Sequence, residues 1–111
     1  MPEDREFIYH SSIRVSDADL QAAKLGRKVC TIRKGLASVA RAATRLQSRN
    51  DSVGINVDRI EKGVRFGDLT EIHAKAEGFN TLSELQADLR QYYRNLTQDT
   101  IMTVIWFHIS S

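Results

Sequence analysis

The chain has 111 residues, of which 41% are hydrophobic and 27% are charged, and its formal net charge is +2. This composition is ordinary for a soluble globular protein, so we expect residues 1–111 to form a single domain. No apolar run approaches the roughly 20 residues that a membrane-spanning helix needs, and the charged N-terminus lacks the apolar core of a signal peptide. We therefore expect a cytoplasmic protein with no membrane partner.

Charge is distributed unevenly along the chain. Residues 1–65 contain 13 basic and 8 acidic residues, a net of +5, whereas residues 66–111 contain 3 basic and 6 acidic residues, a net of −3. Such a basic segment is typical of a surface that binds phosphate, although a solvated basic face without a ligand has the same composition. Within it, residues 24–49 contain eight basic residues and no acidic one: Lys24, Arg27, Lys28, Arg33, Lys34, Arg41, Arg45 and Arg49.

The first third of the chain predicts a strand, a helix and a second strand. Residues 6–10 are rich in aromatic and β-branched side chains, which favours a short strand. Ser16 can cap a helix that has acidic residues in its first turn and ends at Gly26. Residues 29–33 predict the second strand, which contains the sole cysteine, Cys30. Its apolar neighbours indicate a buried thiol, and no Cys/His spacing indicates a zinc site, so we expect no metal and no other cofactor.

The middle of the chain is ambiguous. In residues 36–48 the apolar positions fit helical spacing and favour a helix, although the β-branched residues also permit a strand. A turn at residues 50–52 follows. Alternation of apolar and polar residues from Val53 then predicts a strand that continues to about Arg65.

The last third of the chain predicts two helices and a strand. Residues 69–77 fit a short helix, and Thr81 with Glu84 forms a capping box that opens a second helix ending near Arg94. Residues 100–109 are apolar on both faces, which is typical of a strand in the middle of a sheet. Because strands and helices do not alternate regularly, the order of elements predicts an α+β fold.

Lys28 is the first candidate for catalysis. It lies where the first helix gives way to a strand, and Arg27 and Arg33 place cations around it. Neighbouring positive charge and partial burial both lower the pKa of a lysine, and a lysine that is neutral near pH 7 can act as a general base. Thr31 offers a hydroxyl that such a base could activate, and a carboxylate would be needed to orient the lysine. A solvated or phosphate-binding lysine and an ordinary strand threonine are the alternative interpretations.

Two segments together resemble the ASCH family: Gly-Arg-Lys-x-x-Thr-Ile-Arg at residues 26–33, and Leu-Thr-Glu-x-His-Ala-x-x-Glu at residues 69–77. They are similar in particular to the small bacterial ASCH amidohydrolases that deacetylate N(4)-acetylcytidine. The likeness covers most of the chain and implies a PUA-like β-barrel with flanking α-helices. It also implies that residues 37–48 form a barrel strand, and we follow it there against the helical pattern. Arg41 and Arg45 would then share one face of that strand.

The resemblance also implies the roles of three residues. In those amidohydrolases a lysine and a threonine of the first motif and a glutamate of the second carry the reaction. By motif position they fall on Lys28, Thr31 and Glu77. The resemblance implies that the threonine attacks the acetyl carbonyl, the lysine manages its proton and the glutamate orients the lysine.

Further residues are expected to bind the substrate or RNA. His73 lies one turn before Glu77 and could face the same site, with helix packing as the alternative. Tyr92 and Tyr93 could stack on a base. The expected binding residues are Arg27, Arg33, Lys34, Arg41, Arg45 and His73.

Between Arg33 and Leu69 the chain departs from the amidohydrolase pattern. Those proteins carry a Gly-Asp turn and an acidic stretch there, whereas this chain has Lys34-Gly35 and a run of arginines. A basic cleft suits a polyanion, and other ASCH proteins are linked to RNA binding and some to cleavage of single-stranded RNA. The sequence therefore predicts an amidohydrolase acting on an acylated nucleoside or nucleotide. The alternative is a protein that binds single-stranded RNA, with or without metal-assisted ribonuclease activity.

Overall fold

The computed structural model describes residues 6–40 and 45–110. Ser16 caps the first helix by accepting a hydrogen bond from the Asp19 N–H (3.0 Å), and Thr81 with Glu84 forms a capping box on the third, both as predicted. In chain order the elements are β1 (Phe7–Tyr9), β2 (Ile13–Arg14), α1 (Asp17–Lys24), β3 (Cys30–Lys34), β4 (Ala37–Val39), β5 (Arg45–Gln47), β6 (Ser52–Arg65), the 3₁₀ turn η2 (Phe66–Asp68), α2 (Glu71–Ala76), α3 (Leu82–Tyr92) and β7 (Ile101–Ile109).

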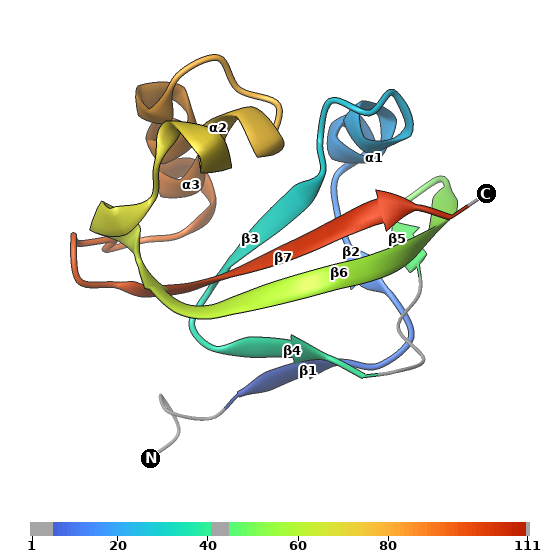
Figure 1. The fold of residues 1–111 in the computed structure, drawn as a ribbon, viewed down its shortest axis with the longest axis horizontal. Helices are drawn as coiled ribbons and strands as arrows, with labels where there is room; N and C mark the ends of the chain where they lie inside the picture. Colours follow the sequence, from blue (N-terminus) through green and yellow to red (C-terminus); the bar gives the residue numbers. More distant parts are fainter. Residues whose placement is uncertain (1–5, 41–44, 111) are drawn as a thin grey trace.

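Five strands form a curled sheet in the order β2-β5-β6-β7-β3, and β1 pairs with β4 in a second, two-stranded sheet (Figure 1). The pairs among β5, β6, β7 and β3 are antiparallel, whereas β2–β5 and β1–β4 are parallel. The long strand β6 has two irregularities in its register with β7, at Val57/Arg59 and Lys62/Val64. Bulges of this kind bend a strand, so they curl the sheet into a half-barrel. The predicted α+β fold with a PUA-like barrel and flanking helices is confirmed.

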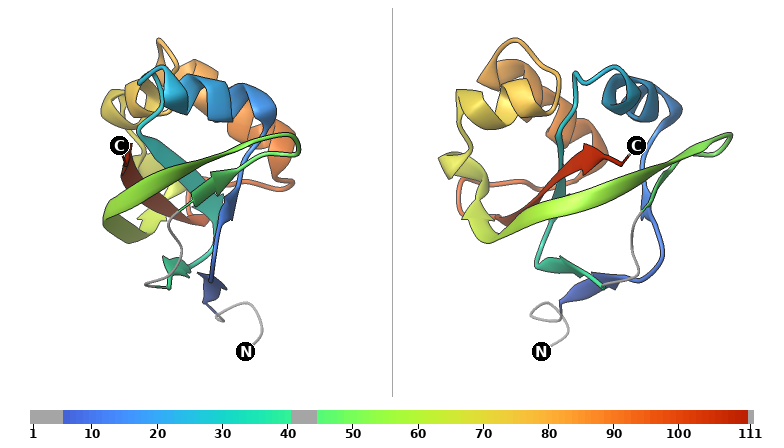
Figure 2. Two further views of the ribbon diagram at one scale, coloured as in Figure 1. Left: turned by 90° about the vertical axis from the view of Figure 1, so that its right-hand side faces the viewer. Right: turned by 45° about the vertical axis from the view of Figure 1, so that its right-hand side comes forward.

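The three helices lie on the same side of the sheet, and the β1–β4 pair lies on the opposite side (Figures 1 and 2). Strand β3 begins between α1 and the two later helices, α2 and α3. The helices and the start of β3 are therefore neighbours in space. In the part of the chain that the structure describes, no helix has the length and apolar character to cross a membrane.

Strand β7 separates two apolar clusters. Met102 and Val104 pack with residues of α2 and α3, whereas Ile105 and Phe107 pack with residues of α1 and β5. Because β7 is also paired with β6 on one edge and β3 on the other, the predicted central position is confirmed. Cys30 is fully buried in the first cluster, and burial raises the pKa of its thiol to about 12, so it is an inert core residue as predicted.

Residues 36–48 differ from the helix that their spacing favours. The structure has strands β4 and β5 there, which agrees with the barrel strand implied by the ASCH resemblance, while Arg41 lies outside the described residues. The helical interpretation is wrong because long-range partners decide the conformation: β4 pairs with β1, and β5 pairs with β2 and β6. Leu46 of β5 is fully buried in the barrel. The two-residue strand β2 is too short to have a sequence pattern.

Candidate active site

A cavity of about 390 Å³ opens between α1, the start of β3 and α3. Lys28, Thr31 and Glu77 all line it, although Lys28 and Glu77 are 49 positions apart in the chain. The structure therefore brings the three residues expected to carry the reaction to the wall of one cavity.

Backbone contacts place Lys28 beside Glu77. The N–H of Val29 donates a hydrogen bond to the carbonyl of Ala76 at the end of α2 (2.7 Å), which joins the start of β3 to that helix. Gly78 has φ +96°, and a Cβ at this position would lie 3.4 Å from the backbone carbonyl oxygen of the residue before Lys28. A glycine is suited to this left-handed turn and this close approach. The segment after α1 thus lies against the end of α2, where Glu77 is the C-cap residue.

Lys28 and Glu77 form a buried ion pair between Nζ and Oε1, with side chains only 2% and 8% exposed. The second carboxylate oxygen of Glu77 accepts a hydrogen bond from the backbone N–H of Ile32 (3.1 Å), so the carboxylate is held between β3 and the amine. Burial lowers the pKa of Lys28 to about 8, although the nearby Asp19 and Asp88 carboxylates act in the opposite direction. A lysine with this pKa has an appreciable neutral fraction near neutral pH.

Thr31 lies next to a fixed guanidinium. Thr31 and Arg33 are two residues apart on β3, so their side chains leave the same face of the strand. Nη1 of Arg33 donates a hydrogen bond to Oγ1 of Thr31, and the guanidinium also donates to the Tyr9 hydroxyl (3.0 Å) and the Arg14 carbonyl (2.7 Å). Within the described residues, no hydrogen bond joins Lys28 to Thr31. The guanidinium is therefore well placed to stabilise negative charge on an oxygen beside Thr31.

The cavity wall is mixed in charge. Asp19 on α1 and Asp88 on α3 both line it, and the pKa of Asp88 is raised by its burial and by the Asp19 carboxylate. The expectation of a predominantly basic cleft is wrong for this cavity, because much of the basic segment lies on other surfaces. The charged lining residues that the structure describes are three basic ones, Arg14, Lys28 and Arg33, and three acidic ones, Asp19, Glu77 and Asp88.

The architecture is shared with solved structures. An ASCH domain from Lactobacillus crispatus JV V101 matches 91% of this chain and 79% of its own, with a TM-score of 0.75 and 12% sequence identity. The chain has the fold of an ASCH domain. The hypothetical protein PH0355 matches 91% of this chain and 99% of its own, with a TM-score of 0.70 and 13% identity. Protein EF3133 from Enterococcus faecalis V583 matches 90% and 76%, with a TM-score of 0.63 and 17% identity.

No protein-family model and no curated protein matches the chain. At 12–17% identity the solved structures establish the ASCH fold and leave the chemistry to be argued from the residues of this cavity.

Several of the expected binding residues lie away from the cavity of this ASCH fold. Arg33 lines it, whereas the exposed residues Arg27 and Lys34 do not. The ammonium of Lys34 donates instead to the backbone carbonyl of Arg94 (3.2 Å). Neither Arg27 nor Lys34 lines this cavity, so substrate or RNA binding by them stays a prediction, and Arg41 lies outside the described residues.

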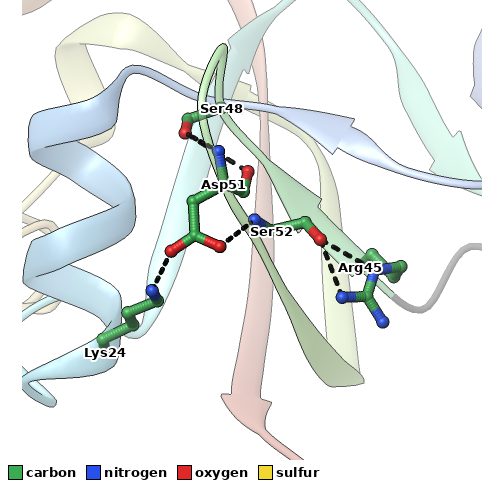
Figure 3. A network of polar contacts seen from close by, with 5 residues as sticks. All are labelled: Lys24, Arg45, Ser48, Asp51 and Ser52. Atoms are coloured by element: carbon green, nitrogen blue, oxygen red, sulfur yellow. Dashed lines mark hydrogen bonds and ion pairs between the residues drawn. The ribbon is translucent and has the colours of Figure 1, made fainter.

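Arg45 belongs to an exposed polar network on the β5–β6 hairpin (Figure 3). Its guanidinium donates two hydrogen bonds to the Ser52 hydroxyl (2.7 and 3.2 Å). Beside it, Asp51 pairs with Lys24 of α1 and accepts a hydrogen bond from the Ser52 N–H (2.7 Å). None of these four residues lines the cavity, and substrate or RNA binding by Arg45 stays a prediction.

His73 is a packing residue of α2, which was the alternative interpretation of this position. Its Nδ1 accepts a hydrogen bond from the Thr70 N–H (3.0 Å), and its Nε2 lies 3.2 Å from Oε1 of Glu61. The same Glu61 oxygen accepts a hydrogen bond from the Trp106 indole N–H (2.6 Å). These contacts join α2 to β6 and β7. His73 does not line the cavity, and the expectation that it binds substrate stays a prediction.

Sequence reasoning missed two acidic residues of the site and identified two tyrosines. Tyr92 and Tyr93, considered as stacking residues, both line the cavity. Asp19 and Asp88 were not singled out. One signal was present for Asp88: it lies three positions after the buried Leu85 of α3, and residues at that spacing share a helix face.

Proposed function

We propose that this protein is an amidohydrolase that removes the acyl group from an acylated cytidine, as a free nucleoside or a nucleotide. The observation that carries the proposal is the buried Lys28–Glu77 ion pair in the same cavity as the Thr31 hydroxyl. Burying two charges is unfavourable for folding, so their presence at a cavity wall is a reason to expect a chemical role. The residue types and the fold also agree with the resemblance to the ASCH amidohydrolases.

The proposed reaction uses this chain's own side chains. Neutral Lys28 accepts the proton of the Thr31 hydroxyl as its oxygen attacks the acyl carbonyl carbon. Arg33, which contacts Thr31, stabilises the negative charge that develops on the carbonyl oxygen. The C–N bond then breaks, the proton passes to the leaving nitrogen, and water hydrolyses the acyl-threonine to release the carboxylic acid. Glu77 holds the lysine in position throughout.

The proton transfer needs one adjustment of the observed geometry. Thr31 is hydrogen-bonded to Arg33, and Lys28 is paired with Glu77. Transfer from Thr31 to Lys28 therefore requires a small side-chain movement or one bridging water molecule when substrate is bound. Catalytic hydrogen bonds commonly shorten on substrate binding.

The direct test is to incubate purified protein with N(4)-acetylcytidine and measure the release of cytidine and acetate. We expect turnover by the wild type and its loss in Lys28→Ala and in Glu77→Gln. Lys75→Ala is the matched control, because Lys75 lies on α2 close to Glu77 in the chain but is exposed and outside the cavity. Equal turnover in the wild type and both cavity variants would exclude the roles given to Lys28 and Glu77.

The second candidate function is binding of single-stranded RNA. It is favoured by the exposed cations of the hairpin, Arg45 and Arg49, and by Lys24 of α1, which pairs with Asp51 of the same hairpin (Figure 3). Positive side chains outside a cavity can follow a phosphate backbone while a base enters the cavity and stacks on Tyr92.

Salt dependence tests the RNA-binding candidate. Phosphate contacts make affinity fall steeply as salt rises, so replacing Arg45 and Arg49 by alanine should weaken RNA binding and reduce that salt dependence. The same variant should deacylate a free nucleoside at the wild-type rate. RNA affinity that is insensitive to salt and to both arginines would exclude this surface as the RNA-binding site.

A further inference from the structure

Asp88 has no evident structural role in the helix that contains it. It lies in the interior of α3, where aspartate has a low helix propensity and receives no benefit from the helix N-terminus. Among residues 6–40 and 45–110, no group donates a hydrogen bond to its carboxylate. Asp19, the other cavity acid missed by sequence reasoning, differs because it lies in the first turn of α1, where a negative charge stabilises the helix.

The walls of the cavity differ in hydrogen-bonding character. The β3 wall presents donors: the ammonium of Lys28, the guanidinium of Arg33 and the hydroxyl of Thr31. The α3 wall presents the Asp88 carboxylate, which is an acceptor, together with Tyr92 and Tyr93. A substrate group that lies between these walls is therefore bound best if it has an acceptor on one side and a donor on the other.

A trans secondary amide has this arrangement. The amide group is planar, and its C=O and N–H bonds point in opposite directions. The proposed attack by Thr31 places the carbonyl oxygen near Arg33 on the β3 wall. The N–H of the same amide then points away from β3, toward the helical side of the cavity.

We propose that the Asp88 carboxylate accepts a hydrogen bond from the substrate's amide N–H, and that the cavity therefore selects secondary amides over acyl compounds that lack this proton. This inference rests on the proposed amidohydrolase function and adds a residue that determines specificity. Partial burial and the neighbouring Asp19 carboxylate disfavour an unpartnered negative charge at Asp88, so a substrate N–H would relieve an existing cost.

A matched pair of substrates tests the inference. N(4)-acetylcytidine carries the N–H, and N(4)-acetyl-N(4)-methylcytidine has the same acyl group and base without it. We expect Asp88→Ala to lower kcat/KM for the first substrate by about tenfold to a hundredfold, as for loss of a hydrogen bond to a charged group, and to leave the second nearly unchanged. Asp88→Asn retains an acceptor oxygen and should fall between the wild type and Asp88→Ala.

The control is Asp99→Ala, which should leave kcat/KM for both substrates unchanged because Asp99 is exposed and outside the cavity. Equal effects of Asp88→Ala on both substrates would overturn the inference. A downward shift of the pH midpoint of kcat/KM with equal effects on both substrates would show that Asp88 acts through Lys28 instead.

A binding experiment distinguishes failure of this inference from failure of the proposed function. The affinities of the two compounds for Thr31→Val protein are measured by calorimetry. If Thr31→Val protein binds the N–H compound more tightly, and Thr31→Val/Asp88→Ala protein does not, Asp88 recognises the N–H even if the wild type shows no turnover. Equal affinities of Thr31→Val protein for the two compounds would overturn the inference.

Discussion

Two lysine–carboxylate pairs of this molecule differ greatly in burial. Lys28 and Glu77 pair inside the cavity with 2% and 8% of their side chains exposed, whereas Lys24 and Asp51 pair on the surface with 34% and 47% exposed (Figure 3). Each pair joins a lysine to a carboxylate, Glu77 in the first and Asp51 in the second, and Lys24 and Lys28 are four positions apart in the sequence. Burial changes the acid–base chemistry of the first pair and leaves the second as one solvated contact among many.

The comparison shows that the density of cations in the sequence does not identify the residues that line the cavity. The basic segment 24–49 supplies Lys28 and Arg33 to the cavity, while Lys24, Lys34 and Arg45 lie on other surfaces. What distinguishes the site is the conjunction of a buried amine, a carboxylate and a hydroxyl.

The largest expected effect is on the nucleophile. Thr31→Val keeps the shape of a β-branched strand residue and removes the hydroxyl, so we expect kcat/KM for N(4)-acetylcytidine to fall by about 10⁴-fold or more, as for loss of other nucleophiles. Thr31→Ser keeps a hydroxyl and should retain measurable turnover. Steady-state kinetics on the two variants checks this. Activity of the Val variant equal to that of the Ser variant would show that Thr31 is not the attacking group.

The buried pair should also dominate stability. Lys28→Met leaves the Glu77 carboxylate buried without its cation, and we expect it to lower the free energy of unfolding by about 3 kcal/mol. Adding Glu77→Gln removes the uncompensated charge and keeps an acceptor for the Ile32 N–H. The double variant should therefore be more stable than Lys28→Met alone. Urea denaturation of both variants measures this, and a double variant that is less stable would contradict it.

The pH dependence of activity should report the protonation of Lys28. The pKa of Lys28 is lowered to about 8 by burial, and the amine must be neutral to accept a proton. Below this pKa the neutral fraction rises about tenfold per pH unit, so kcat/KM should rise with pH at that slope and level off above about pH 8. Lys28→Arg, which stays protonated, should be inactive throughout. A rate that falls between pH 6 and pH 8 would contradict the proposed role.

Local signals predicted much of the fold. The caps at Ser16 and Thr81 and the two-faced apolar pattern of residues 100–109 are properties of short segments, and the structure has each of them. The helix predicted for residues 36–48 was wrong because the strands there pair with β1 and β6, which come from other parts of the chain. Helical spacing cannot report such long-range pairing.

The candidate site was predicted unevenly for a similar reason. Lys28 and Thr31 are close in sequence, and the resemblance to a family supplied Glu77. Asp88 was missed because its spacing from the buried Leu85 predicts only the helix face on which it lies, whereas its place in the cavity depends on how α3 packs. Arg45 was assigned to the cleft from the composition of its segment, whereas β5 places it on the hairpin.

The smallest expected effects are those on the exposed pair. Lys24→Ala removes one solvated contact, so we expect a melting temperature and an activity within error of the wild type. Asp51→Ala also removes the acceptor for the Ser52 N–H (2.7 Å), so it should lower the melting temperature measurably while leaving activity unchanged. Calorimetry at low and high salt separates the two contributions, because salt screens the ion pair more than the backbone hydrogen bond. A loss of stability in Lys24→Ala as large as that in Lys28→Met would mean that burial is not what distinguishes the two pairs.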